Sequence, residues 1–154
     1  MKTCTVETCN TKSYCKQLCQ RHYTRLRKGQ PLVKILDRSN WTECNIAWLA
    51  GIIEGEGTFT LRGKDKHTTI KIVSTDFDVI DKIQAVIGTG RINGPYKRSD
   101  NRKYFKVWSL HESYPQKELM LAILPWMCKR RAIRIRQCLR VLTTALKNSK
   151  NPYQ

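Results

Sequence analysis

Residues 41–59, WTECNIAWLAGIIEGEGTF, decide the fold because their hydrophobic pattern changes partway along. Thr42 is a suitable N-cap residue, and the residues after it are apolar nearly all round, which predicts a buried helix. Beyond Gly57 apolar residues alternate with polar ones, which predicts a strand. The stretch therefore predicts a helix that ends near Glu54 and Glu56 and passes directly into a sheet.

Small residues recur along one side of this predicted helix. Ala47, Gly51 and Gly55 follow one another at intervals of four, and Ala50 lies beside them. Glycine inside a helix costs about 1 kcal/mol relative to alanine, so close packing against a second helix should compensate. We expect Ala47, Ala50, Gly51 and Gly55 to form such a contact.

Glu54 and Glu56 lie at the carboxyl end of the helix, where its dipole disfavours anions by up to about 1 kcal/mol. A bound cation would reverse the sign of this argument. Two solvated acids before a turn would give the same pattern, so spacing alone does not choose between a metal site and a surface turn.

Two further segments read as β-hairpins. Apolar and polar residues alternate over residues 58–73 on either side of a turn at 63–67, and over 90–110 on either side of a tip at 99–102.

Helical patterns fill the remaining segments. Thr75 and Asp78 offer a capping box for a helix that ends at Gly88. A short helix over 116–123 follows, and Pro125 is expected to begin a last helix that reaches Leu146. The predicted fold is α+β, with the order α-β-β-α-β-β-α and a four-stranded antiparallel sheet.

The composition favours a polyanionic partner. The chain has 154 residues, 29 Lys+Arg and 12 Asp+Glu, which gives a net charge of +17. A hydrophobic content of 40% is enough for a core, which argues against a disordered basic tail. No apolar run reaches the roughly 18 residues of a membrane helix, and the amino terminus has no apolar segment typical of a secretory signal. We therefore expect an intracellular protein without membrane contact.

The basic side chains concentrate where a nucleic acid would be bound. A twisted antiparallel ribbon fits the major groove, and a cationic last helix suits phosphate contacts, although a solvated sheet face is the simpler alternative. The residues expected to contact DNA from the strands and tips are Arg62, Lys64, Lys66, Lys71, Arg91, Lys97, Arg98, Arg102, Lys103 and Lys106. The last helix is expected to contribute Lys129, Arg130 and Arg131.

Cysteines crowd the amino terminus. Cys4, Cys9, Cys15 and Cys19 precede His22, in a segment with too few apolar residues to fold on a core of its own. A closed metal site is the natural way to stabilise such a segment, and five candidate ligands exceed the four that tetrahedral zinc needs.

The spacing of this segment resembles a small zinc module found at the front of many phage-encoded endonucleases. The resemblance implies that Cys4, Cys9, Cys19 and His22 bind Zn²⁺ and that Cys15 does not. It also implies a basic helix after His22, whose Arg25 and Arg27 we expect to contact DNA phosphates. The predicted domains are a zinc module over 1–35, a linker over 36–40 and a second domain over 41–154.

Leu49–Gly57, LAGIIEGEG, closely resembles the signature of the LAGLIDADG homing endonucleases. The resemblance covers about residues 41–146 and implies a site-specific endonuclease that cuts both strands of DNA. It implies that Glu56 binds a divalent cation, Mg²⁺ or Mn²⁺, with help from the carbonyl of Gly55. Glu54 matches an acid with a helix-packing or capping role, and Lys106 and Ser74 are the nearest candidates to order the attacking water.

One chain carries one copy of this motif, so we expect a homodimer. A two-fold contact through the small residues would bring two Glu56 carboxylates together near the axis, over a long pseudo-palindromic DNA site. Two alternatives remain open: a maturase or repressor of the same fold that does not cleave, and a zinc-containing RNA-binding protein. The resemblance leaves three origins of the gene open: an intron, an intein or a freestanding gene.

Overall fold

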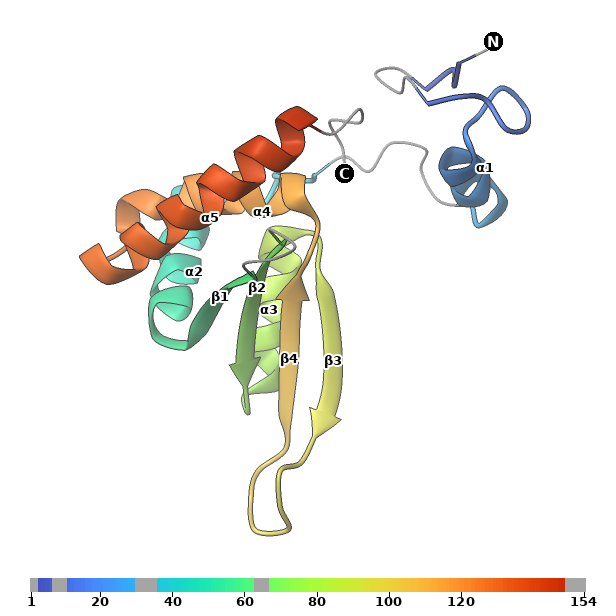
Figure 1. Ribbon diagram of the computed structural model, residues 1–154. Helices are drawn as coiled ribbons and strands as arrows, with labels where there is room; N and C mark the ends of the chain where they lie inside the picture. The colour runs from blue at the N-terminus through green and yellow to red at the C-terminus, as the bar shows by residue number, and fades with distance from the viewer. Residues whose placement is uncertain (1–2, 7–10, 30–35, 63–66, 149–154) are drawn as a thin grey trace.

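The computed structural model describes residues 3–6, 11–29, 36–62 and 67–148 (Figure 1). In chain order, its elements are α1 (Gln20–Arg27), α2 (Glu43–Glu56), β1 (Gly57–Arg62), β2 (His67–Ser74), α3 (Phe77–Ile87), β3 (Arg91–Tyr96), β4 (Phe105–Leu110), α4 (Ser113–Ile123), the 3-10 turn η1 (Leu124–Trp126) and α5 (Lys129–Asn148). No helix in these ranges combines the length and apolarity that a membrane span requires.

The four strands form one antiparallel sheet in the order β1-β2-β4-β3. Each predicted hairpin is present, and β2 and β4 pair to join the two hairpins at the centre of the sheet. The predicted α+β fold and its element order are confirmed, and Figure 1 shows α3 running along one side of the sheet.

Strand alternation separates the two faces of the sheet. Ile72 pairs with Trp108 in the register of β2 and β4, and both side chains are fully buried against the helices. The neighbouring pair, Lys71 and Ser109, therefore points to the opposite face, and Arg91 on β3 continues the same row. One face of the sheet thus builds the core, and the other presents basic side chains.

The junction between α2 and β1 is sharp. The helix begins as predicted, because the Thr42 hydroxyl oxygen accepts a hydrogen bond from the Asn45 amide at 3.3 Å. At the other end, a Cβ added to Gly57 would lie 2.5 Å from the carbonyl oxygen of Ile53. Only glycine fits this turn, and it lets the chain leave the helix directly after Glu56.

Three predicted helix starts are wrong, and one of them is α4, which begins at Ser113 rather than at residue 116. Asp76, rather than Thr75, is the N-cap residue of α3, and its amide donates to the Ser74 hydroxyl at 3.0 Å. This local hydrogen bond holds the turn one residue beyond the predicted capping box. Pro125 lies in η1, and extended backbone at Met127 separates that turn from α5.

Part of the predicted linker is packed on the core. Arg38 forms an ion pair with Glu118 on α4, and its guanidinium lies 5.4 Å from the centre of the Trp41 ring. Asn40 donates to the carbonyl of Ala85 on α3 at 3.0 Å. We call residues 36–41, which precede α2, the strap, because their side chains bond to both α3 and α4.

Candidate metal and nucleic-acid site

Glu56 is the last residue of α2, and its exposed side chain lines a cavity of about 620 Å³. The end of β2 contributes Ser74 to this cavity, and the start of α3 contributes Asp76. The loop between β3 and β4 contributes three cations, Arg98, Arg102 and Lys103. The fold therefore brings the predicted metal ligand together with three of the predicted DNA contacts.

The cavity combines acidic oxygens with an excess of cations. Carboxylate oxygens are the ligands that Mg²⁺ prefers, and guanidinium and ammonium groups suit phosphate oxygens. Within the described residues, no side chain of the protein forms a hydrogen bond or an ion pair with Glu56. The carboxylate is thus available to a ligand. Asp76 was not predicted for this site; its position directly after β2, two residues from Ser74, was the signal in the sequence.

Glu54 has different surroundings from Glu56. Its carboxylate accepts a hydrogen bond from the Cys128 amide at 3.2 Å, at the amino end of α5. The contact supports the capping role that the resemblance implies for Glu54. A negative side chain is favourable there because the helix dipole places partial positive charge at that end.

The two predicted helpers of the attacking water are paired in register across β2 and β4 but have different surroundings. Ser74 lines the cavity, whereas Lys106 is absent from the described lining. The Lys106 ammonium lies 3.6 Å from the Asp81 carboxylate on α3 and 4.6 Å from the centre of the Phe77 ring. Lys106 therefore points to the helix-covered side of the sheet, and the structure does not support its assignment as a catalytic or DNA-contacting residue.

The small-residue side of α2 is open with one exception. Cβ atoms added to Gly51 and Gly55 would meet no atom within 4 Å, and Ala47 is half-buried. Ala50 has 1% of its surface exposed and belongs to the core, so its predicted place in a dimer contact is wrong. The helix turns Ala50 inward because it lies one residue from the Gly51 side.

The other predicted DNA contacts fall into three groups. Arg62, Lys71 and Arg91 are exposed on the strands.

The loop between β3 and β4 holds the second group. Lys97 lies 5.4 Å from the centre of the Tyr104 ring, beside the exposed Arg98 that stacks over Phe105. The aromatic partners of these two cations, Tyr104 and Phe105, were not predicted from the sequence. Lys64 and Lys66 lie outside the described residues.

On α5, Lys129 and Arg130 are exposed, but Arg131 is half-buried. The Arg131 guanidinium donates to the main-chain carbonyl of Glu54 at 3.1 Å. Its predicted contact with DNA is therefore replaced by a contact within the protein.

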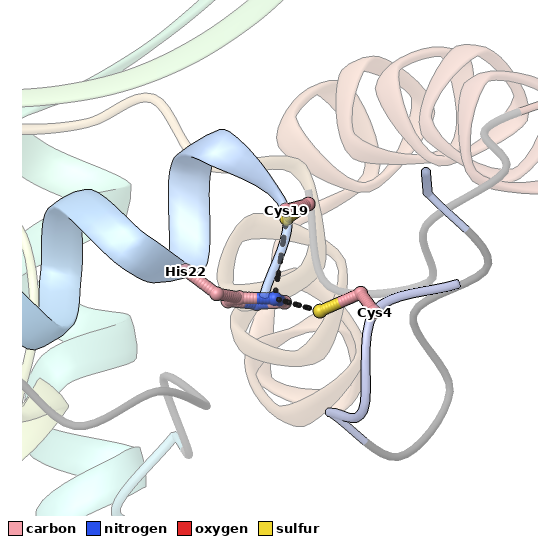
Figure 2. Close-up of side chains that lie close together, drawn as sticks. All are labelled: Cys4, Cys19 and His22. Carbon is pink, nitrogen blue, oxygen red and sulfur yellow. Dashed lines mark hydrogen bonds between the residues drawn. The ribbon is translucent and has the colours of Figure 1, made fainter. Parts of the chain in front are cut away.

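A second cluster lies in the amino-terminal segment, where Cys4, Cys19 and His22 converge (Figure 2). His22 Nδ1 lies 3.2 Å from Cys4 Sγ and 3.4 Å from Cys19 Sγ, and all three residues are buried. Ligands of tetrahedral zinc at ordinary bond lengths are separated by about 3.6 Å. The group could hold a zinc ion.

The chemistry around His22 favours a metal ligand. Burial, together with the nearby Arg21 and Arg25, lowers the pKa of His22 from its ordinary value. A lowered pKa keeps the imidazole neutral, which is the form that binds metal. Cys15 lies outside the cluster, and Cys9 lies outside the described residues, so the fourth predicted ligand stays a prediction. Arg25 and Arg27 lie in the last turn of α1, as expected for a basic helix after His22.

Several solved structures share this fold. The homing endonuclease I-CvuI, in complex with the I-CreI target, matches with a TM-score of 0.53 at 17% sequence identity, over 71% of this chain and 72% of that chain. The group I intron-encoded homing endonuclease I-CeuI, complexed with DNA, gives a TM-score of 0.55 at 14% identity, over 84% of this chain and 68% of that one. The LAGLIDADG meganuclease I-AabMI, bound to uncleaved DNA, gives 0.54 at 14% identity, over 67% of this chain and 38% of that one.

No protein-family model matches the chain, and no curated protein matches it in sequence. At identities of 14–17%, the structural matches show a common fold rather than a common activity. The chain has a LAGLIDADG-like fold.

Proposed function

We propose that this protein is a site-specific endonuclease that cuts both strands of DNA with the help of a divalent cation. The observation that supports this function best is the position of Glu56. Its carboxylate has no protein partner in the described part of the chain, and it shares a cavity with Arg98, Arg102 and Lys103. An acid in an ordinary surface turn would have no structural reason to share a cavity with three cations.

The residues around Glu56 fit a hard cation such as Mg²⁺, but one chain provides few ligands. Glu56 offers a carboxylate, and the carbonyl of Gly55 lies one residue before it. Among the described residues, three grouped metal-binding side chains occur only in the amino-terminal cluster. A cation at Glu56 would therefore complete its coordination with DNA phosphate, water or a second protein copy. When bound, it would activate a water molecule and stabilise the leaving oxygen.

The protein's own side chains would position the DNA. Arg98, Arg102 and Lys103 would hold the phosphate groups on either side of the scissile bond, where their charges offset the repulsion between phosphate and Glu56. Ser74 lines the same cavity and would hold a water molecule by hydrogen bonding. Arg62, Lys71 and Arg91 would follow the groove along the exposed face of the sheet.

A homodimer would complete the site. The open side of α2, formed by Ala47, Gly51 and Gly55, lets a second α2 approach closely, because no described residue of this chain fills the space beside the two glycines. A two-fold axis there would place two Glu56 side chains near each other and give each strand of DNA its own carboxylate.

The decisive experiment compares wild-type protein with Glu56→Gln on DNA that carries the insertion-site sequence of the gene. We expect double-strand cleavage with Mg²⁺ by the wild type and none by Glu56→Gln, which should retain its DNA affinity and its melting temperature. Binding without nicking by the wild type would contradict the endonuclease and favour the maturase or repressor alternative. A monomer on DNA by light scattering would contradict the symmetric site.

A further inference from the structure

The end of α2 and the start of α5, which meet near the cavity, each lack a residue whose charge would offset the helix dipole. α2 has no basic residue in its last turn, and α5 has no acidic residue in its first turn. Both ends would therefore carry uncompensated dipole charge, negative on α2 and positive on α5.

Each helix contributes one side chain that offsets the dipole charge at the end of the other helix. Glu54 of α2 accepts from the Cys128 amide at the start of α5, and Arg131 of α5 donates to the Glu54 carbonyl in the last turn of α2. The amide and the carbonyl are both groups that lack an intrahelical partner near a helix end. Each helix thus caps the end of the other, through one hydrogen bond of 3.2 Å to the Glu54 carboxylate and one of 3.1 Å to the Glu54 carbonyl.

This exchange acts on the backbone that carries Glu56. The next carbonyl toward the amino end, that of Ile53, accepts from the amide of Gly57. Arg131 fixes the Glu54 carbonyl, so the backbone on both sides of Gly55 is held before the chain turns into β1. The side chain of Glu56 itself stays uncommitted and faces the cavity.

We propose that Arg131 is a positioning residue for the metal site: it holds the last turn of α2 so that Glu56 and the Gly55 carbonyl point at one position. This inference rests on the proposed function of Glu56. The guanidinium contributes one hydrogen bond, from Nη2, while its Nε has no partner among the described residues. A lysine at position 131 offers a similar single donor, whereas a methionine offers none.

The test measures the Mg²⁺ concentration for half-maximal cleavage in Arg131→Met, Arg131→Lys and wild-type protein. We expect Arg131→Met to need about tenfold more Mg²⁺, in line with the effect of removing groups that orient metal ligands. Its DNA affinity in the presence of a chelator should change little, and Arg131→Lys should recover much of the wild-type metal dependence.

Leu142→Ala is the matched control for general destabilisation. Leu142 is buried at the far end of α5, with 2% of its surface exposed, and lies away from the α2 junction. This variant should lower the melting temperature without changing the Mg²⁺ requirement. An unchanged requirement in Arg131→Met, or an equal shift in Leu142→Ala, would overturn the positioning role.

A second measurement separates this inference from the proposed cleavage. Mn²⁺ binding to the protein–DNA complex, followed by electron paramagnetic resonance, does not depend on turnover. If the wild type binds Mn²⁺ without cutting, the endonuclease proposal fails, and weaker Mn²⁺ binding by Arg131→Met still supports positioning. A wild type that neither cuts nor binds Mn²⁺ would overturn both.

Discussion

Glu54 and Glu56 are two residues apart and have the same chemistry, yet they have different surroundings and therefore different expected roles. The Glu54 carboxylate is used within the protein, at the start of α5. The Glu56 carboxylate is exposed in a cavity with Arg98, Arg102 and Lys103. A helix turns by about 100° per residue, so side chains two apart point to nearly opposite sides of the axis.

The first prediction concerns Glu54→Gln. The amide oxygen can still accept from the Cys128 amide, but the charge that complements the α5 dipole is lost. We expect the free energy of unfolding to fall by about 0.3–1 kcal/mol, measured by chemical denaturation, while cleavage persists. Loss of cleavage with unchanged stability would mean that Glu54 binds the metal rather than caps α5.

Glu56→Gln should behave in the opposite manner, which makes it the natural partner of this measurement. Its exposed side chain has no hydrogen bond or ion pair to lose among the described residues, so its unfolding free energy should stay within about 0.5 kcal/mol of wild type.

At this scale the sequence predicted Glu56 and Lys106 for one site, and of the two only Glu56 is among the described residues that line the cavity. An acid at the end of a buried helix is visible in a residue pattern. The side of the sheet that a lysine occupies depends on register, and β3 and β4 shift register between Asn93 and Tyr96. Lys106 pairs with Ser74, and in this register its side chain faces α3. Near an irregular hairpin, the alternation of residues in the sequence does not determine which face a side chain occupies.

At the scale of elements, α2 has one side in the core and one side without a partner among the described residues. Leu49 and Ile53 are fully buried, whereas Gly51 and Gly55 are exposed to open space. The sequence predicted a helix with small residues on it, and the structure shows that three of the four face outward. Ala50 was misassigned because a helix that is apolar nearly all round does not reveal which apolar residues face the core.

The second prediction uses Gly51→Ala and Gly51→Leu. An alanine has room in a single chain and should raise helix stability by up to about 1 kcal/mol. A leucine would push apart a second helix that docks there, so we expect it to shift the protein from dimer to monomer in analytical ultracentrifugation. A stable dimer of Gly51→Leu would exclude this side of α2 as the contact.

The third prediction concerns the metal in the amino-terminal segment. Cys4, Cys19 and His22 supply three ligands, and Cys9 is the proposed fourth. We expect one zinc ion per chain by mass spectrometry of the intact protein, lost in Cys9→Ser and retained in the control Cys15→Ser. The reverse result would make Cys15 the ligand.

The pH dependence of this segment follows from His22. Because burial lowers the pKa of His22 in the folded state, folding favours the neutral ring, and its contribution is present above about pH 6.5. Stability should then fall as the pH drops from about 6.5 through the lowered pKa. Zinc release should follow the same direction, because the protonated ring does not bind metal.

At the scale of the whole molecule, the strap determines where the amino-terminal segment is attached. Arg38 and Asn40 tie the strap to α4 and α3, so the attachment point lies at Leu36, where the strap begins. From Gly29 to Leu36 a chain can span at most about 25 Å, even when fully extended. The sequence predicted a linker over residues 36–40, but a local sequence pattern carries no information about the contact between Arg38 and Glu118, 80 positions apart.

The last prediction is that removing residues 1–35 lowers the affinity for DNA and shortens the DNA footprint, while residues 36–154 stay folded. The strap and the main core remain, so the melting temperature should change by only a few degrees. Arg25 and Arg27 are the proposed phosphate contacts of the removed part, and each contact contributes about 0.9 to the slope of log affinity against log salt. We therefore expect that slope to fall by about 2 for each chain, with protection lost at the ends of the DNA footprint.

Arg25→Gln combined with Arg27→Gln in the full-length chain provides the matched control. These substitutions leave the cysteines and the strap in place, so they test the charges apart from the fold of the segment. An equal decrease in salt slope for the double substitution and the truncation would locate the contacts on α1. A slope unchanged by truncation would mean that the sheet and α5 hold the DNA alone, because every phosphate contact displaces bound counterions wherever it lies.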